Sequence, residues 1–148
     1  MNGLALETAA QAAPAVAVDV RGEFDVAGVI AAAMRFCSRH GLGGVFGAHV
    51  ATAASELANN LWMHALHGGQ VRLALIERGA QRGIELQAED DGPGIADIAL
   101  ALTEGYSTGG GMGCGLPGVR RLMDEFQVES RPGAGTRVVA RKWLRSRS

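Results

Sequence analysis

The stretch "GYSTGGGMGCGLPGVRRLMDEF", residues 105–126, places seven of the chain's 22 glycines in its first fourteen positions and then continues as an amphipathic segment. Glycine lacks a Cβ atom, so consecutive backbone N–H groups can turn toward one point, and the start of a helix adds unpaired donors with a partial positive charge. Together these features predict an anion site, most naturally for phosphate, in front of a helix over residues 116–126. A flexible surface loop is the alternative that this stretch alone leaves open.

Two familiar kinds of phosphate site do not fit this stretch. Gly113, Gly115 and Gly118 have the G-x-G-x-x-G spacing of a dinucleotide fingerprint. That fold needs an apolar strand directly before the first glycine, and "YSTGG" cannot supply one. The P-loop and the common protein-kinase site both need a lysine, whereas the only lysine of this chain is Lys142, near the C-terminus.

The composition predicts one globular domain. The chain has 148 residues, 47% apolar residues, 20% charged residues and a net charge of −1, which excludes a disordered chain and a strongly basic nucleic-acid binder. Two cysteines are too few for a disulfide framework, so a reducing cytoplasm is expected. No signal peptide and no membrane-spanning run is recognisable. Residues 1–15 are expected to form a mobile tail, and residues 16–148 the domain.

The pattern of apolar residues predicts strands and helices that alternate in pairs. Its elements are strands over 16–24, 70–78, 83–91, 127–130 and 136–144, and helices over 26–43, 47–69, 97–102 and 116–126. Short turns join neighbouring strands, so the sheet is expected to be largely antiparallel with the helices on one face. The predicted fold class is an α/β two-layer sandwich.

The segment "EDDGPGI", residues 89–95, places an acidic pair at the end of a strand and before a glycine-containing turn. A carboxylate in that position can accept a hydrogen bond from the exocyclic amine of adenine, whereas guanine presents a carbonyl oxygen there and is repelled. The glycines allow a flat ring to approach the backbone. An ordinary acidic hairpin turn is the competing interpretation.

The segment "SELANN", residues 55–60, lies inside the predicted second helix. Glu56 and Asn60 are four residues apart, so they share one side of the helix, at the rim of its apolar stripe. An amide oxygen there can bind Mg²⁺ that also bridges phosphates, and a carboxylate one turn away can take a proton from an attacking hydroxyl. A solvated helix edge is the alternative for this pair on its own. His64 and His67 lack a third ligand, so they are not expected to bind a metal.

These three segments, in this order and followed by "GAGT" at residues 133–136, strongly resemble the N box and the two glycine boxes of the GHKL ATPase family. Within that family, the chain is most similar to the RsbT-type switch kinases, which are small bacterial serine/threonine protein kinases. The resemblance covers about residues 16–145. It implies the Bergerat ATP-binding fold and the cofactors ATP and Mg²⁺.

The resemblance also implies roles for particular residues. Glu56 is the expected general base, Asn60 the expected Mg²⁺ ligand, and Asp90 the carboxylate that reads adenine, with Asp91 in a variable position. Residues 104–113 are expected to form a lid over the phosphates. The further expected nucleotide-binding residues are Gly92, Gly94, Ser107, Thr108, Gly109, Gly110, Gly111, Met112, Gly113, Gly115, Leu116 and Thr136, the last as a support for Asp90. Arg120 and Arg121 either lie near the phosphates or face a partner protein.

The resemblance implies a kinase that phosphorylates a small STAS-domain antagonist protein and then binds and activates a metal-dependent serine phosphatase. Two alternatives stay open: an anti-sigma factor of the same fold that holds a sigma factor, and a binding module that no longer transfers phosphate. Neither nucleic acid nor a membrane is expected as a partner.

Overall fold

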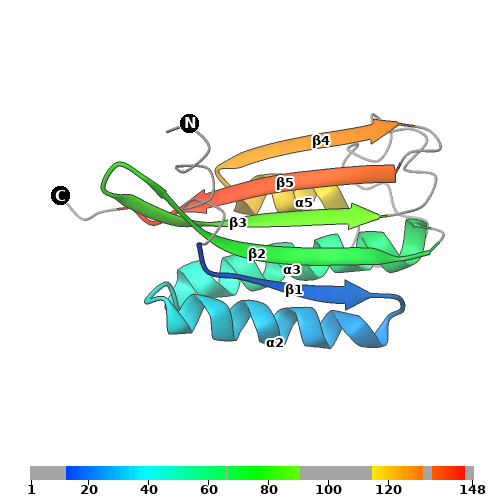
Figure 1. Ribbon diagram of the computed structural model, residues 1–148, viewed down its shortest axis with the longest axis horizontal. Coiled ribbons are helices and arrows are strands. Elements are labelled where there is room, and N and C mark those ends of the chain that lie inside the picture. Colours follow the sequence, from blue (N-terminus) through cyan, green and yellow to red (C-terminus); the bar gives the residue numbers. More distant parts are fainter. Residues whose placement is uncertain (1–12, 66, 91–114, 132–134, 146–148) are drawn as a thin grey trace, which may run out of the picture.

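The computed structural model describes residues 13–65, 67–90, 115–131 and 135–145, and its elements form two layers (Figure 1). Five strands form one antiparallel sheet in the order β1-β2-β3-β5-β4. The elements in chain order are β1 (Ala15–Val20), α2 (Phe24–Arg39), α3 (Gly44–His64), β2 (Gly69–Arg78), β3 (Gln81–Asp90), α5 (Gly115–Leu122), β4 (Glu125–Arg131) and β5 (Gly135–Trp143).

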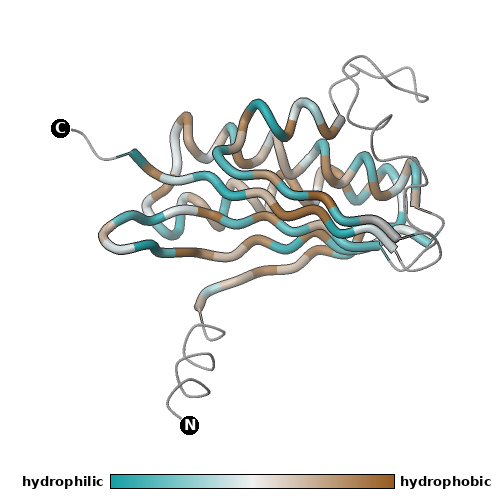
Figure 2. Tube along the Cα trace, turned by 90° about the horizontal axis from the view of Figure 1, so that it is seen from above, coloured by the Kyte–Doolittle hydropathy of each residue, from teal (hydrophilic) through white to brown (hydrophobic). Residues whose placement is uncertain are grey.

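The helices cover one face of the sheet, and the core lies between the two layers (Figure 2). Alternate residues of each central strand point toward the helices, as the two-residue period of a strand requires. Small side chains such as Ala53, Ala54 and Ala58 line the buried side of α3, so this helix lies close against the sheet. The core residues of the central elements are Val50, Leu57, Leu61, Val71, Leu73, Ile84, Leu86, Ala88, Val138 and Ala140. The expected α/β two-layer sandwich is confirmed.

The last predicted helix is too long. It was expected over 116–126, but α5 ends at Leu122 and β4 begins at Glu125. Asp124 turns the chain because its backbone N–H donates to the Arg141 carbonyl oxygen at 2.8 Å, while its carboxylate accepts the backbone N–H of Trp143 at 2.8 Å. Phe126 then pairs with Ala140 in the sheet. An apolar residue at this position satisfies a helix pattern and a strand pattern equally well, so the sequence alone did not mark the change.

Other element ends also differ from the prediction. The helix expected over 26–43 ends at Arg39, and the helix expected over 47–69 runs from Gly44 to His64. Arg78 pairs directly with Gln81, which leaves a two-residue hairpin loop in which Gly79 has a φ of 61°. The short helix expected over 97–102 lies outside the described residues.

The side chain of Lys142, the only lysine of the chain, links β5 to the end of α5. The Nζ atom of Lys142 donates to the Leu122 carbonyl oxygen at 3.0 Å and lies 5.8 Å from the ring centre of Phe46. A cation at the carboxyl end of a helix is favourable because the last carbonyl groups there lack intrahelical partners. Lys142 therefore helps to hold the end of α5 against the sheet.

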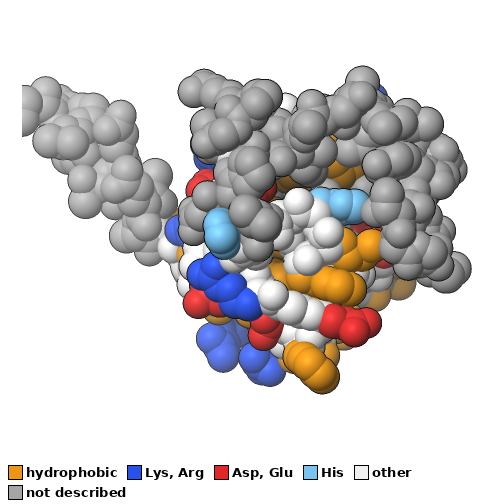
Figure 3. All heavy atoms as spheres, turned by 90° about the vertical axis from the view of Figure 1, so that its right-hand side faces the viewer, with side chains coloured by type: hydrophobic (Ala, Val, Ile, Leu, Met, Phe, Trp, Pro, Cys, Tyr) orange, Lys and Arg blue, Asp and Glu red, His pale blue; other side chains and the backbone are white. Residues whose placement is uncertain are grey.

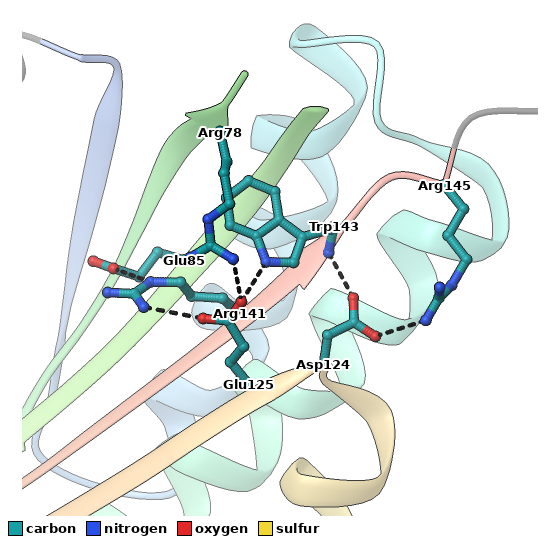
Figure 4. Close-up of polar contacts among 7 residues, drawn as sticks. All are labelled: Arg78, Glu85, Asp124, Glu125, Arg141, Trp143 and Arg145. Atoms are coloured by element: carbon teal, nitrogen blue, oxygen red, sulfur yellow. Dashed lines mark hydrogen bonds and ion pairs between the residues drawn. The ribbon is translucent and has the colours of Figure 1, made fainter. Parts of the chain in front are cut away.

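The opposite face of the sheet carries a polar cluster near the β2–β3 hairpin (Figure 4). Glu125 accepts hydrogen bonds from Arg78 at 2.8 Å, from the indole N–H of Trp143 at 2.8 Å and from Arg141 at 3.1 Å. These bonds, the one from Arg78 most of all, lower the pKa of Glu125 to about 2. Arg141 also pairs with Glu85 at 2.8 Å, so the cluster joins four strands.

Candidate nucleotide-binding site

The buried carboxylate of Asp90 is the centre of the candidate site. Asp90 is the last residue of β3 and is 9% exposed. Its side chain points to the helix side of the sheet, as do those of Ala88, two residues earlier, and Leu86, four residues earlier. The backbone N–H of Thr136 on β5 donates to Oδ2 of Asp90 at 3.1 Å. A buried carboxylate needs such donors, because an unpaired charge in an apolar environment is very costly.

Two glycines allow the neighbouring strands to approach Asp90 closely. A Cβ atom on Gly69, which pairs with Asp90 in the sheet, would lie 2.0 Å from the Glu89 carbonyl oxygen and 3.0 Å from Cα of Asp90. On the other side, Gly135 has a φ of +94°, and a Cβ atom there would lie 2.6 Å from the Asp90 carbonyl oxygen. The sequence pattern predicts Gly69 only as the end of the second helix. Its role depends on strand pairing, which no local pattern reveals.

A small cavity of about 20 Å³ lies beside Asp90. It has apolar walls and three polar residues, Asn60, Asp90 and Thr136. The remaining lining residues are Leu57, Leu61, Ala65, Ala88 and Val138. This volume admits about one water molecule. The carboxyl end of α3, the end of β3 and the start of β5 meet here, at the right of Figure 1.

α3 separates the two neighbouring asparagines of "SELANN". The side-chain oxygen of Asn59 accepts the indole N–H of Trp62 at 2.9 Å, whereas Asn60 lines the cavity. Glu56 lies one turn before Asn60 and is half-buried. The structure therefore brings Asn60, Asp90 and Thr136 together around one cavity, with Glu56 one helical turn away along α3.

α5 begins where the glycine-rich stretch ends. Gly115 is its first residue, and Leu116 is only 1% exposed because it packs into the core. Any contact between Leu116 and a ligand therefore has to come from its backbone. Arg120 and Arg121 are exposed and lie in the last turn of α5, away from the helix start.

The remaining predicted site residues lie outside the described residues, so their roles stay predictions. They are Asp91, Gly92, Gly94 and the lid residues Ser107, Thr108, Gly109, Gly110, Gly111, Met112 and Gly113.

The described surface at this end of the molecule carries both signs of charge (Figure 3). The described side chains alone therefore provide no uniformly basic surface for a phosphate. Within the described parts of the chain, no three His, Cys, Asp or Glu residues are grouped so that they could hold a metal ion. His64 and His67 are both exposed. A Mg²⁺ ion does not need such a group, because it is commonly held by one or two protein oxygens together with phosphates and waters.

Comparison with known proteins assigns the family. Residues 47–146 match the family model described as "Histidine kinase-, DNA gyrase B-, and HSP90-like ATPase", which is more than half of the chain. The chain belongs to this family. This GHKL membership agrees with the expectation from the three motifs, and the antiparallel sheet with helices on one face is the fold that the expectation named.

The relatives of this GHKL domain include proteins named as a protein kinase and as an anti-sigma factor. The chain is 41% identical over 128 residues to "Serine/threonine-protein kinase RsbT" of Bacillus subtilis, covering 86% of this chain and 96% of that protein. It is 33% identical over 101 residues to "Anti-sigma F factor" of Clostridium novyi, covering 66% of this chain and 71% of that protein. A solved structure, "Mycobacterial sensor histidine kinase MprB", shares the fold with a TM-score of 0.52 and 18% identity, over 88% of this chain and 97% of that one.

None of the described helices of this GHKL domain is both long enough and apolar enough to cross a membrane.

Proposed function

We propose that this chain is an ATP- and Mg²⁺-dependent protein serine/threonine kinase of a bacterial partner-switching module, and that it works in the cytoplasm. The observation that carries the proposal is the 41% identity to RsbT, which extends over 86% of this chain and 96% of that kinase. The cavity lined by Asn60, Asp90 and Thr136 supports the proposal, because the buried carboxylate of Asp90 and the side-chain amide of Asn60 line the same space within the family's fold.

Asp90 is the group that selects the base. Its Oδ2 atom is held by the N–H of Thr136, and its carboxylate borders the cavity. A carboxylate accepts a hydrogen bond from the exocyclic amine of adenine, whereas guanine presents a carbonyl oxygen, which is itself an acceptor. The site therefore prefers ATP over GTP. The cavity has room for about one water molecule. Residues beyond the described ones therefore complete the nucleotide site, and we assign this role to Gly92, Gly94 and residues 107–113.

Asn60 and Glu56 have separate roles in phosphoryl transfer. The amide oxygen of Asn60 would hold the Mg²⁺ ion, which would neutralise phosphate charge when the nucleotide is bound. Glu56 accepts the proton of the substrate hydroxyl while that oxygen bonds to the γ-phosphorus, and the bond from the γ-phosphorus to the β–γ bridging oxygen breaks to release ADP. Because the two side chains lie one turn apart on α3, the helix itself sets their spacing.

The proposed substrate is a STAS-domain antagonist protein, phosphorylated on a serine or threonine, and the released kinase then binds a metal-dependent serine phosphatase. A second candidate function is favoured by a specific observation. The chain is 33% identical to an anti-sigma F factor, so a kinase that also holds a sigma factor directly is the alternative.

The test compares ATP affinity and phosphoryl transfer for the same set of variants. The wild-type chain is incubated with ATP, Mg²⁺ and each STAS protein encoded beside it, and phosphoprotein is measured by mass spectrometry. Glu56→Gln is expected to keep ATP affinity within a few-fold and to lose transfer by roughly 10²- to 10⁴-fold. Asn60→Ala is expected to weaken both ATP binding and transfer.

Asn59→Ala is the matched control, because this neighbouring amide bonds to Trp62 instead of lining the cavity. It should leave transfer close to that of the wild type. Absence of transfer to any STAS protein by the wild type would make the chain a binding module. Capture of a sigma subunit without transfer to a STAS protein would favour the anti-sigma alternative.

A further inference from the structure

The solvent face of the sheet carries a regular pattern of charges across β3, β5 and β4. The strand register sets three rows side by side on this face: Glu85, Arg141 and Glu125 in the first, Gln87, Val139 and Gln127 in the second, and Glu89, Arg137 and Glu129 in the third. In both charged rows, an arginine on β5 stands between two glutamates. The charge therefore alternates from strand to strand, and each charged row ends in an acid on β4, the last strand of the sheet.

The first row is completed by a further arginine. Arg141 pairs with Glu85 at 2.8 Å and with Glu125 at 3.1 Å (Figure 4). Arg78 of β2 also pairs with Glu125, at 2.8 Å. Both acids of this row therefore have a cationic partner within the chain.

The third row lacks such a completion. Arg137 pairs with Glu89 at 3.5 Å, and both side chains are more than half exposed. Because its Nε atom faces Glu89 on β3, Arg137 does not compensate the acid on the β4 side. Glu129 is exposed and has no ion pair among the described residues. It is therefore the one acid of the two charged rows for which the described part of the chain supplies no counter-charge.

A cavity of about 120 Å³ lies between the two charged rows, over the middle row. Its floor is apolar because the half-buried Val139 is the short side chain at the centre of that row. Gln87 donates its amide N–H to Glu85 at 2.8 Å, which leaves its side-chain oxygen as an acceptor. Gln127 and Glu129 bring further acceptor oxygens to the same cavity. The cavity therefore suits a group that has an apolar stem and several N–H donors.

The edge of the sheet next to this cavity is able to accept another strand. β4 is the last strand of the sheet, at the top of Figure 1, and it pairs with β5 over the whole of Glu125–Arg131 without a bulge. An edge strand presents backbone N–H and C=O groups that an extended segment can pair with. In such an added strand, the residue beside Glu129 continues the third row. The alternation of charge requires that residue to be basic.

We propose that β4 binds an extended segment of a partner protein as a sixth strand, and that an arginine of this segment lies beside Glu129 with its guanidinium group at the cavity. Arginine fits this position better than lysine, because its planar group carries five N–H donors and can bond a carboxylate and an amide oxygen at once. Its methylene groups cover Val139, as long basic side chains commonly cover apolar surface. Pairing of opposite charges across strands adds to the backbone hydrogen bonds.

The proposed surface lies on the other side of the sheet from the nucleotide site. Successive residues of a strand point to opposite faces, so Glu89 and Arg137 face solvent, whereas Asp90 and Thr136 face the helices. A partner on β4 can therefore bind while a nucleotide occupies the other side. This inference does not depend on the kinase activity.

An NMR titration of the full chain with two synthetic peptides tests the proposal. The peptides are acetyl-Ser-Val-Thr-Val-Arg-Val-Ser-amide and the same sequence with glutamate in place of arginine. The arginine peptide is expected to bind with a dissociation constant on the order of 0.1 mM and to shift the amide signals of residues 125–131. It should also slow hydrogen exchange of the N–H groups of β4 that point away from β5. The glutamate peptide should bind at least about fivefold more weakly.

Charge reversal at Glu129 tests the chemistry of the contact. Glu129→Arg should invert the preference, so that the glutamate peptide binds more tightly than the arginine peptide. Asp19→Arg is the matched control, because Asp19 is an exposed acid on the same face of β1, the other edge strand. That variant should bind the arginine peptide within about twofold of the wild type, since its charge lies at the far edge of the sheet. Circular dichroism and thermal unfolding check that each variant is folded.

Three results would overturn the proposal: equal affinity for the two peptides, signal shifts confined to residues away from β4, or an unchanged preference in Glu129→Arg. Shifts of the β4 signals that depend on protein concentration without any peptide would show that a second copy of the chain occupies this edge. That result would also overturn it.

Discussion

Asp90→Asn removes one negative charge from the candidate site while keeping the size of the side chain. The Thr136 N–H can still donate to the remaining amide oxygen, as it does to Oδ2 of Asp90 at 3.1 Å. The amide group must then present its NH₂ donors toward the cavity, where the exocyclic amine of adenine is also a donor. We therefore expect the protein to stay folded and ATP binding to weaken.

The expected magnitude follows from the bond that is lost. A hydrogen bond to a charged group contributes about 1.5–3 kcal/mol, and the mismatch leaves a donor facing a donor. ATP affinity should therefore fall by about 10- to 100-fold, and the preference for ATP over GTP should largely disappear, because an NH₂ group can donate to the guanine carbonyl.

The assay is calorimetric titration of ATP and GTP into each variant, with thermal unfolding measured in parallel. Glu89→Gln is the matched control: it makes the same chemical change one residue earlier, on the opposite face of β3, where the side chain is 57% exposed and pairs with Arg137 at 3.5 Å. It should bind ATP like the wild type. If Asp90→Asn keeps both the affinity for ATP and the preference over GTP, the role assigned to Asp90 is wrong.

Three further predictions concern stability and reactivity. Gly69→Ala should reduce the free energy of unfolding by about 3 kcal/mol, because the new Cβ atom would lie 2.0 Å from a backbone oxygen. Gly79 lies in open space at a φ of +61°, so Gly79→Ala should reduce the free energy of unfolding by only about 1 kcal/mol. Chemical denaturation measures both changes. The pKa of Glu125 is lowered from 4.5 to about 2. Ionised Glu125 should therefore add about 1 kcal/mol, a value reduced by solvent screening, to the free energy of unfolding. This stabilisation is present above pH 4.5 and is lost as the pH falls toward 2. Glu125→Gln should flatten that part of the stability profile, and an unchanged slope would contradict the assignment. Burial raises the pKa of the Cys37 thiol to about 11. In a Cys114→Ser variant, the folded protein should therefore resist alkylation, measured by mass spectrometry, until it is unfolded. Rapid labelling of the folded chain would argue against a buried thiol.

Local patterns in the sequence predicted the helices and strands and their order along the chain. The apolar positions 50, 53, 54, 57, 58, 61, 62 and 65 predicted one buried side of the second helix. The first six of these positions are buried, whereas Trp62 and Ala65 are half-buried. The alternation over residues 83–91 predicted a strand, which the structure starts at Gln81 and ends at Asp90. Such patterns are readable because burial on one side of a helix or strand repeats with a fixed period along the chain. The order of motifs along the chain also sufficed to indicate the GHKL family.

Contacts between distant segments could be decided only by the tertiary structure. The acidic pair 90–91 offered two candidate carboxylates, and Asp90 is found buried on the helix side, where it meets Thr136 on a strand 46 residues later. The sequence predicted a role for Asn60 from its spacing to Glu56, and the structure shows that Asn60 lines the cavity whereas the adjacent Asn59 accepts a hydrogen bond from Trp62. Gly69 became important only because strand pairing sets it against Asp90. The physical reason is that the chemistry of a side chain is written in the sequence, but its burial, its partners and the space around it depend on the packing of segments far apart along the chain.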